Sequence, residues 1–552
     1  MANGIQHVFV LMLENRSFDH MLGFSGITGI DASSGGATQV TGLSPLALRP
    51  VLEAFQVNSI GGIVQKEGQN WPPLTTISAR QLLASNSTLP ATEGADFVMP
   101  LDPGHAFLDV LMQLCGQGIV YLGGQYPPVV NTGFAANYAA QPGFVVGQGP
   151  PGPGEIMKCY SPSRQLPVLN QLATEFVVCD NWHASMPGPT WPNRFFAHAA
   201  SSGGLDHSPS TGDLPGGTVP FGGFGFPNGT IFDRMNDNNL NWRIYAGDDF
   251  PIVLALNGIN FNDINDYGDF AADVSQPDYP ASYTFIEPSY GDWTSGTFKC
   301  GTSQHPLDDV TRGESLIKAT YESLRASPLW GQSLLIITWD EHGGFYDHLP
   351  PPPAVAPGDT PPGSPEWNEW NQYGFTFQQY GPRVPAVVIS PLISRNLIDH
   401  RLYDHASIPA TIEACFGLSP MTQRDARAAN LMTLITQSTP RSDTPATLHA
   451  PAPSGVTGCD PVSFDRRLAT GPAVQSAVLP VTRPQDSIDE GNLPGFLSVV
   501  LRSDLALTPP EQQAGVLARF NTIKTRQDAA SYVSEVAPKV RAARNALSGK
   551  KT

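Results

Sequence analysis

The chain has 552 residues, of which 41% are hydrophobic and 14% are charged, a balance typical of globular proteins and not of disordered ones. Its formal net charge of -18 argues against a nucleic-acid partner, because the phosphates of nucleic acid carry the same sign. No run reaches the roughly eighteen apolar residues that a membrane-spanning helix needs. The first twenty residues lack the basic start of an export signal, so we expect a cytoplasmic protein, or a secreted or periplasmic one if a signal lies outside this sequence.

Five short apolar runs predict buried β-strands, and each ends at a polar residue. They span residues 7–13, 176–178, 283–286, 333–339 and 384–389. Unbroken apolar strands of this length favour a mostly parallel sheet covered on both faces. Helical patterns lie between them at 166–174, 194–200 and 315–326. We therefore expect an α/β sandwich, whose ligand binds at the carboxyl ends of the strands.

Glycine and proline are abundant, with 54 and 53 residues, which predicts long loops of functional importance. The largest loops are 203–229 and 349–365. Beyond about residue 430 the chain is rich in Pro, Thr and Ser and shows few strand signals. Residues 508–511 resemble a capping box, and apolar residues from Val533 to Leu547 predict an amphipathic helix despite Pro538. We expect two parts, 1–430 and a loop-rich, then helical extension at 431–552.

The basic end of the extension has two interpretations. Residues 521–552 hold seven Lys or Arg side chains against two acidic ones. Packing of the helix against the acidic main body is favoured, and contact with a membrane or nucleic acid is the alternative.

Two pairs of residues with side-chain oxygen atoms follow predicted strands. Glu14 and Asn15 come after the first strand, where they serve either as ordinary turn residues or as oxygen ligands for a hard cation. Asp340 and Glu341 end the most apolar strand and precede two glycines. Adjacent carboxylates repel each other without a cation, so this pair favours a metal site. An all-oxygen set favours Ca²⁺, Mg²⁺ or Mn²⁺ over zinc, although zinc is not excluded.

Thr190 is a candidate nucleophile. It lies in the segment PGPTWPNR, whose prolines predict a rigid extended approach to a helix that starts near residue 193. A hydroxyl beside a helix N-terminus suits phosphate, because free N–H groups and the helix dipole favour an anion there. An ordinary N-cap threonine is the alternative.

Histidines in loops are candidates for acid–base chemistry or phosphate binding. His105 and His305 lie beside Gly or Pro in segments without helical periodicity, although a lone loop histidine is often an ordinary surface residue. His342 and His348 follow the acidic pair and can simply line the loop. His405 is better explained as the start of a helix.

The chain resembles the phosphoesterase family of bacterial phospholipases C, acid phosphatases and plant non-specific phospholipases C. The resemblance spans roughly residues 5 to 420 and rests on segments in the same order: ENRSFDH at Glu14, DPGH at His105, PGPTWPNR at Thr190, QHP at His305, TWDEHGGFYDH at Asp340 and RVPAVVISP at Arg383. It implies an alkaline-phosphatase-like core, with residues 1–430 as the catalytic domain.

The resemblance also implies roles for these residues. One divalent metal ion would be bound by Glu14, Asn15, Asp340, Glu341 and the Thr190 hydroxyl, and Thr190 would form a phosphothreonine intermediate. His305 would protonate the leaving oxygen and His105 would hold phosphate oxygens, although spacing alone does not decide which histidine, His348 included, is the acid. Further candidates for substrate contacts are His348, Asn193 and Arg194.

Three functions remain open at this point. The first is a phospholipase C acting on phospholipids, with possible transient contact to a membrane surface. The second is an acid phosphatase acting on small soluble phosphates. The third, a non-catalytic lipid- or phosphate-binding protein, is disfavoured because the ligand set is complete. Phe221, Phe224 and Phe226 would form an apolar rim for acyl chains or fold back onto the core.

The six cysteines are widely spaced and form no C-x-x-C pair. A zinc knuckle is therefore not expected, and disulfides are expected only in an oxidising compartment.

Overall fold

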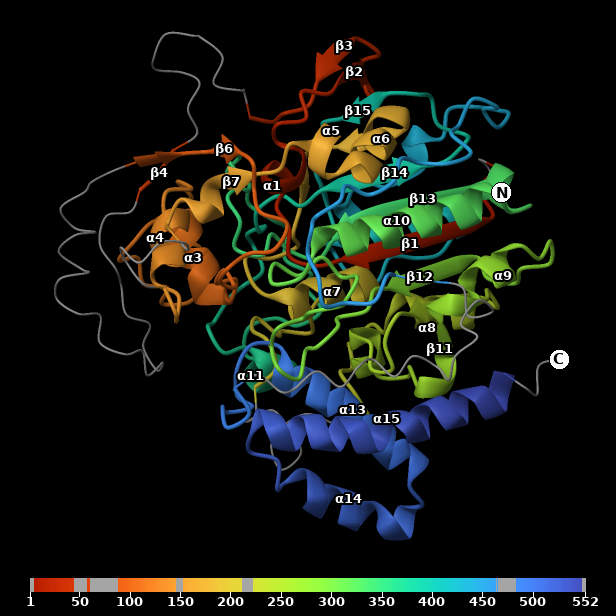
Figure 1. Cartoon of the computed structure of the whole chain (residues 1–552). Coiled ribbons are helices and arrows are strands. Elements are labelled where there is room, and N and C mark those ends of the chain that lie inside the picture. Colours follow the sequence, from red (N-terminus) through yellow and green to blue (C-terminus); the bar gives the residue numbers. More distant parts are fainter. Residues whose placement is uncertain are drawn as a thin grey trace.

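The computed structural model describes residues 4–43, 57–59, 88–144, 152–210, 222–462, 464 and 483–548. Its centre is a 10-stranded sheet with the order β11-β10-β12-β1-β13-β14-β8-β15-β2-β3 (Figure 1). The strands are β1 (His7–Leu13), β2 (Thr28–Asp31), β3 (Ala37–Gln39), β8 (Val177–Cys179), β10 (Trp242–Ala246), β11 (Ile264–Asp266), β12 (Tyr283–Glu287), β13 (Ser333–Trp339), β14 (Ala386–Ile389) and β15 (Leu397–Asp399).

The remaining elements are short strand pairs and helices. The pairs are formed by β4 (Val57–Ser59), β5 (Thr88–Pro90), β6 (Thr92–Glu93), β7 (Lys158–Cys159), β9 (Trp182–His183) and β16 (Tyr403–Asp404). The helices of the main body are α1 (Phe18–Leu22), α3 (Phe107–Cys115), α4 (Phe134–Ala139), α5 (Pro162–Gln165), α6 (Pro167–Glu175), α7 (Thr190–Ala199), α8 (Ile231–Asp237), α9 (Phe270–Val274), α10 (Val310–Arg325), α11 (Pro365–Trp370) and α12 (Ser407–Phe416).

The sheet is mostly parallel, as the sequence predicts. β1 lies between β12 and β13 and runs parallel to both. Every residue of β13 is buried, as are the last six residues of β1, so both faces of these central strands are covered. The exceptions to the parallel arrangement are β14, which runs antiparallel to β13 and β8, and β3, which runs antiparallel to β2.

The predicted bounds agree with the structure to different degrees. The runs at 7–13 and 333–339 are β1 and β13, and the helix predicted at 166–174 is α6. The helix predicted at 315–326 begins five residues earlier, because Asp309 caps it by accepting a hydrogen bond from the N–H of Thr311. The helix predicted at 194–200 is α7, which begins four residues earlier at Thr190.

The C-terminal part is helical. It contains α13 (Leu493–Leu507), α14 (Gln513–Phe520) and α15 (Arg526–Ser548), which continues through Pro538 as predicted. Figure 1 shows these helices, in blue, below α7. The buried side chains of α13 belong to the same hydrophobic core as β1 and β13, and the boundary at residue 430 stays a prediction.

The capping box predicted at 508–511 is wrong. The Thr508 hydroxyl donates to the carbonyl oxygen of Asp504 at 2.7 Å, so it bonds back to α13. A 3-10 turn at Pro510–Gln512 follows before α14 begins.

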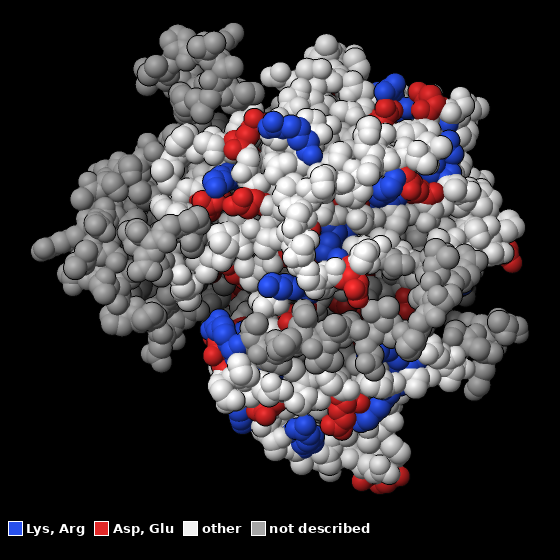
Figure 2. Space-filling view, in the orientation of Figure 1, with Lys and Arg blue, Asp and Glu red and all other residues white. Residues whose placement is uncertain are grey.

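The surface carries charged side chains of both signs (Figure 2). In Figure 2, Lys and Arg side chains lie beside Asp and Glu side chains, and the described residues form no continuous basic patch on this face. None of the helices in the described part of the chain has the length and apolar character to cross a membrane.

Candidate active site

The pairs Glu14-Asn15 and Asp340-Glu341 meet at the carboxyl edge of the sheet. β1 and β13 are paired in register up to Leu13 and Trp339, so the residues that follow them are neighbours. The N–H of Asn15 donates to Oδ1 of Asp340 at 2.9 Å, and the N–H of Arg16 donates to the carbonyl oxygen of Glu341 at 2.9 Å. Glu14, Asn15, Asp340 and Glu341 are all buried. The structure therefore brings together two pairs that are more than 300 residues apart in sequence.

Several oxygens of this cluster have no hydrogen-bond donor. Within the described residues, neither carboxylate oxygen of Glu14 accepts a hydrogen bond, and neither does Oε1 of Glu341. Buried carboxylates without partners are costly unless a cation compensates their charge. Asn15 adds an amide oxygen to the same cluster, and Ca²⁺, Mg²⁺ and Mn²⁺ prefer such oxygen ligands. The residues present therefore fit a divalent cation.

The proton affinities of these acids support this interpretation. Burial, followed by the charge of Asp340, raises the pKa of Glu14 well above its usual value. Burial also raises the pKa of Asp340, to about 7, although the neighbouring Arg194 guanidinium lowers it. Both directions reflect carboxylates held in a buried site, where a bound cation would favour their ionised form.

Thr190 faces this cluster from the first turn of α7. It is fully buried, and its Oγ1 donates to Oδ1 of Asn15 at 3.4 Å. The sequence places it just ahead of the helix, as a possible N-cap, but the structure makes it the first helical residue. The N-cap is Pro189, and no side-chain hydrogen bond caps the helix. The Thr190 hydroxyl is therefore oriented toward the acidic cluster, at the positive end of the α7 dipole.

Arg194, one turn beyond Thr190, connects α7 to the acidic cluster. Its Nε lies 2.9 Å from Oδ2 of Asp340, and one terminal nitrogen donates to the carbonyl oxygen of Leu13 at 3.0 Å. Its other terminal nitrogen, Nη1, has no hydrogen-bond acceptor among the described residues. The guanidinium therefore fixes α7 against the ends of both central strands.

Asn193, also predicted to contact substrate, bonds to the loop that precedes α7. Its Oδ1 accepts from the N–H of Met186 at 3.0 Å, and its Nδ2 donates to the carbonyl oxygens of Gly188 and Pro189 at 3.0 Å each. These bonds fix the loop that leads to Thr190. A contact between Asn193 and the substrate stays a prediction.

His105 and His305 lie in adjacent loops beside the acidic cluster. Nε2 of His305 is 3.9 Å from Oδ1 of Asp102, and its ring stacks on Phe298 with centroids 3.5 Å apart. Burial and then the charge of His105 lower the pKa of His305 well below its usual value. Burial also acts to lower the pKa of His105, but the carboxylates of Glu341 and Asp102 together raise it to about 9. Of the two rings, His105 is the one whose pKa is raised above its usual value.

His348 belongs to a different cluster. Its Nδ1 lies 2.7 Å from Oδ2 of Asp19, and Asp347 lies close enough to complete a group that could hold a metal ion. Arg383, however, already pairs with Asp19 at 3.0 Å and with Asp347 at 2.9 Å. The guanidinium therefore supplies the positive charge of this cluster, and a role of His348 toward substrate stays a prediction.

Asn492 is not singled out by the sequence, and His405 is interpreted there only as the start of a helix. Nδ2 of Asn492, at the start of α13, donates to Oγ1 of Thr190 at 3.3 Å. Nε2 of His405 lies 2.5 Å from the carbonyl oxygen of Asp340, so this histidine supports the acidic cluster, two residues before α12 begins. No sequence signal links Asn492 to Thr190. The position of His405 between Asp404 and a helix is a weak signal of a role near the site.

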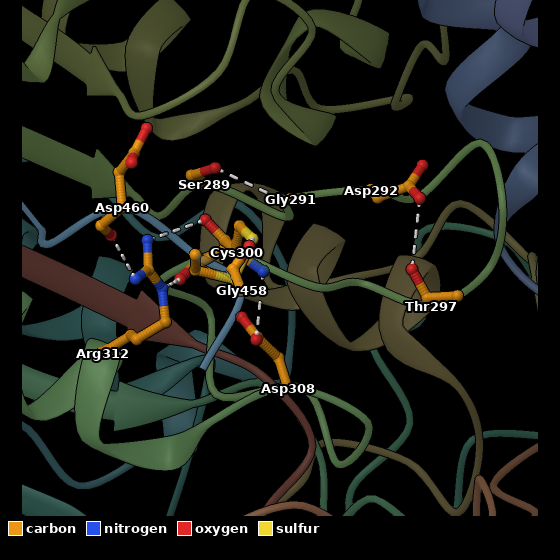
Figure 3. The surroundings of a disulfide bond; sticks show 11 residues. Ser289, Gly291, Asp292, Thr297, Cys300, Asp308, Arg312, Gly458 and Asp460 are labelled. Carbon is orange, nitrogen blue, oxygen red and sulfur yellow. Dashed lines mark hydrogen bonds between the residues drawn. A yellow bond between two sulfur atoms is a disulfide. The ribbon is translucent and has the colours of Figure 1, made fainter. Parts of the chain in front are cut away.

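A disulfide anchors the loop that leads to His305. Cys300 pairs with Cys459. As Figure 3 shows, the Arg312 side chain lies beside this bond, and it donates to the backbone oxygens of Cys300 at 3.1 Å and Asp460 at 2.9 Å. The carboxylate of Asp308 accepts from the N–H of Cys300 at 3.1 Å. The loop that ends at His305 is therefore joined to the chain beyond residue 430.

The proposed phenylalanine rim is not supported by the described residues. Phe224 is 4% exposed, and its ring lies 5.0 Å from that of Phe195. Phe226 packs on the same ring at 5.6 Å. Of the two alternatives, folding back onto the core is the observed one for Phe224 and Phe226. Phe221 lies outside the described residues.

The chain is similar to several known proteins. The model of the Phosphoesterase family matches residues 5–419. The chain is 34% identical to non-specific phospholipase C6 of Arabidopsis thaliana over 471 residues, covering 82% of this chain and 76% of the relative. It is 25% identical to phospholipase C A of Mycobacterium tuberculosis, covering 81% of this chain and 80% of the relative.

Among solved structures, a protein of the alkaline phosphatase superfamily from Vibrio parahaemolyticus is similar at 14% identity. The match covers 49% of this chain and 62% of that protein, with a TM-score of 0.28. The family match and the plant relatives establish the assignment: this chain belongs to the Phosphoesterase family and is a hydrolytic enzyme acting on phosphate esters.

Proposed function

We propose that this protein is a metal-dependent phospholipase C that hydrolyses the glycerol-side phosphate ester of phospholipids through a phosphothreonine intermediate. The observation that carries this proposal is the position of Thr190, whose hydroxyl donates to Asn15 beside buried carboxylate oxygens that accept no hydrogen bond from the described residues. The plant and mycobacterial relatives named phospholipases C support phospholipid as the substrate.

Glu14, Asn15, Asp340 and Glu341 would hold the cation together with the Thr190 hydroxyl. When bound, the cation would act as a Lewis acid that lowers the pKa of this hydroxyl and offsets negative charge on the phosphoryl oxygens. Arg194 keeps Oδ2 of Asp340 and the first turn of α7 in a fixed relation, so that Thr190 needs little reorientation before it reacts.

Thr190 would then release its hydroxyl proton to water and attack phosphorus through Oγ1. The new Oγ1–P bond forms as the bond between phosphorus and the glycerol oxygen breaks, and diacylglycerol leaves once that oxygen receives a proton. Water subsequently cleaves the phosphothreonine and releases the phosphorylated headgroup, so that Thr190 regains its hydroxyl.

A histidine supplies the proton to the leaving oxygen. The family resemblance assigns this role to His305, but the pKa of His305 is lowered and that of His105 is raised to about 9. A general acid must carry its proton at working pH. Glu341 contributes most to the raised pKa of His105 and would also bind the cation, whose charge would offset that contribution. His105 and His305 therefore both stay candidates for the proton donor.

The test is a substrate profile of the purified enzyme. Phosphatidylcholine should yield diacylglycerol and phosphocholine, a chelator should abolish this activity, and added Ca²⁺, Mg²⁺ or Mn²⁺ should restore it. Sphingomyelin and p-nitrophenyl phosphate complete the profile. Turnover of p-nitrophenyl phosphate without any release of diacylglycerol would contradict the phospholipase assignment and favour a soluble phosphatase.

We also propose an oxidising location, secreted or periplasmic, for this protein. The disulfide between Cys300 and Cys459 supports this, because such bonds persist mainly outside the reducing cytoplasm. Titration of free thiols in protein isolated from its native host should find four, the number of cysteines outside the disulfide. Finding all six would contradict the proposed location.

A further inference from the structure

The loop between α3 and α4, residues 116–133, exposes an unusual amount of apolar surface. Leu122 is 92% exposed, Val120 71%, Val130 52% and Ile119 43%. In the described part of the chain, the other large hydrophobic side chains with this degree of exposure are scattered singly: Ile30, Leu402 and Val456. Isolated apolar residues on a surface are normal, whereas a contiguous group marks an interaction site.

This apolar loop also lacks charge. Between Asp109 and Glu155 the sequence contains no Asp, Glu, Lys, Arg or His, although the whole chain has a net charge of -18. A surface for a charged protein or for nucleic acid would carry complementary charges. The exposed side chains of the loop are instead aliphatic, whereas Tyr121 and Tyr126 pack inward on Phe107.

The framework of the loop is held by hydrogen bonds, so its apolar side chains stay exposed. The Tyr121 hydroxyl donates to the carbonyl oxygen of Gly124 at 2.7 Å. The N–H of Gly124 in turn donates to the carbonyl oxygen of Gly374 at 3.1 Å. At the other end, Nδ2 of Asn131 donates to the carbonyl oxygen of Asp347 at 2.9 Å. These bonds fix the base and the middle of the loop against segments that follow Glu341.

Helix α3 joins the loop to the active site. His105 lies two residues before α3, and the loop leaves its other end, roughly 13 Å away for nine helical residues. Gln113 connects the helix to the site, because its Nε2 donates to the carbonyl oxygen of Gly104 at 2.6 Å and its Oε1 lies 2.7 Å from Nε2 of His342. The loop and His105 thus belong to one ordered unit.

We propose that residues 116–133 form the membrane-docking surface of this enzyme and insert Val120 and Leu122 into a zwitterionic phospholipid surface. The absence of charge in the loop, together with the acidity of the chain, favours zwitterionic over anionic lipid, since anionic headgroups repel the protein and find no cation here. This inference rests on the proposed phospholipase activity and names the surface that would bring the site to its substrate.

The test uses the full-length protein and phosphatidylcholine vesicles. In a sedimentation assay the double variant Val120→Gln/Leu122→Gln should bind roughly tenfold or more weakly than the wild type, because two side chains lose their transfer into lipid. Hydrolysis of p-nitrophenyl phosphate should stay unchanged. The matched control Val456→Gln, which alters an exposed valine elsewhere, should bind as the wild type does.

Two results would overturn the docking surface: equal vesicle binding by the double variant and the wild type, or no vesicle binding by the wild type. Tighter binding of the wild type to anionic than to phosphatidylcholine vesicles would overturn the preference for zwitterionic lipid. The proposed function fails separately, if the wild type binds phosphatidylcholine vesicles but releases no diacylglycerol from them. The two failures are therefore distinguishable in one set of measurements.

Discussion

The side-chain amide of Asn492 donates a hydrogen bond to Oγ1 of Thr190 across 302 residues of sequence. Asn492 is 6% exposed, and its own oxygen accepts a hydrogen bond from Ser208 at 3.0 Å, which fixes the orientation of the amide. Directly behind it, Gly495 approaches Trp191 so closely that a Cβ would lie 2.4 Å from the indole ring. The start of α13 therefore forms part of the wall around the nucleophile.

Replacing Asn492 by Ala should lower kcat and leave KM nearly unchanged. The variant loses one hydrogen bond that orients the attacking hydroxyl, worth about 0.5–1.5 kcal/mol, or roughly two- to tenfold in rate. Steady-state kinetics on p-nitrophenyl phosphate would measure this. Asn521→Ala, at an exposed asparagine after α14, is the control. Wild-type kcat in the Asn492 variant would show that Thr190 does not depend on α13.

The positions of the acidic residues at the edge of the sheet could be predicted from the sequence because the strands before them are easily recognised. β1 and β13 are unbroken apolar runs, so Glu14 and Asp340 follow directly at the carboxyl ends of adjacent strands. The start of α7 was misplaced because Pro192 interrupts the helical pattern. Proline is tolerated in a first turn, where its missing N–H would have no partner, and the helix therefore begins at Thr190.

Contacts between distant segments could not be predicted in the same way. The bond from Asn492 to Thr190 and the pairing of Cys300 with Cys459 depend on how the C-terminal part folds back, and neither has a local pattern. The buried bond from His405 to Asp340 is similar, because a histidine before a helix is common without any such role.

Cation binding should depend on pH in a defined direction. The folded-state pKa values of Asp340, about 7, and of Glu14 are raised above the usual 3.8 and 4.5. The folded protein therefore binds more protons than the unfolded chain, and the metal-free form loses stability as the pH rises from about 4 through 7. A cation that displaces these protons should bind more tightly at high pH.

The measurement is the rise in melting temperature when Ca²⁺, Mg²⁺ or Mn²⁺ is added to chelator-treated protein. The rise should be larger at pH 8 than at pH 5. Glu14→Gln should reduce the rise at pH 8, because it removes one ligand and one titrating group. An equal rise at both pH values would contradict the assignment of the cation to Glu14 and Asp340.

The buried pair of Arg194 and Asp340 should be essential for stability. Arg194→Met leaves Asp340 buried without its partner and should reduce the free energy of unfolding by about 3–5 kcal/mol, measured by urea denaturation. The comparison is Arg395→Met, at a pair with Glu175 whose arginine is 59% exposed. Its effect should stay below about 1 kcal/mol. Equal effects of the two substitutions would refute the structural role of Arg194.

The disulfide should contribute to stability under oxidising conditions. The double variant Cys300→Ser/Cys459→Ser should reduce the free energy of unfolding by about 2–4 kcal/mol, because the unfolded chain gains freedom. Dithiothreitol should have the same effect on the wild type and none on the variant. Cys415→Ser, at a partly exposed free thiol, is the control for losing a cysteine. A wild type insensitive to dithiothreitol would rule out this contribution.

The most direct test of the account is the chemical state of Thr190 during turnover. The enzyme is mixed with excess phosphatidylcholine and a divalent cation, quenched in acid within one turnover and digested. Mass spectrometry of the peptide that contains Thr190 should then show one added phosphorylated headgroup or phosphoryl group on this residue. Thr190→Ala should show neither the adduct nor activity, and Thr190→Ser should retain both in part. An unmodified Thr190 peptide, together with wild-type kcat in Thr190→Ala, would contradict the covalent mechanism.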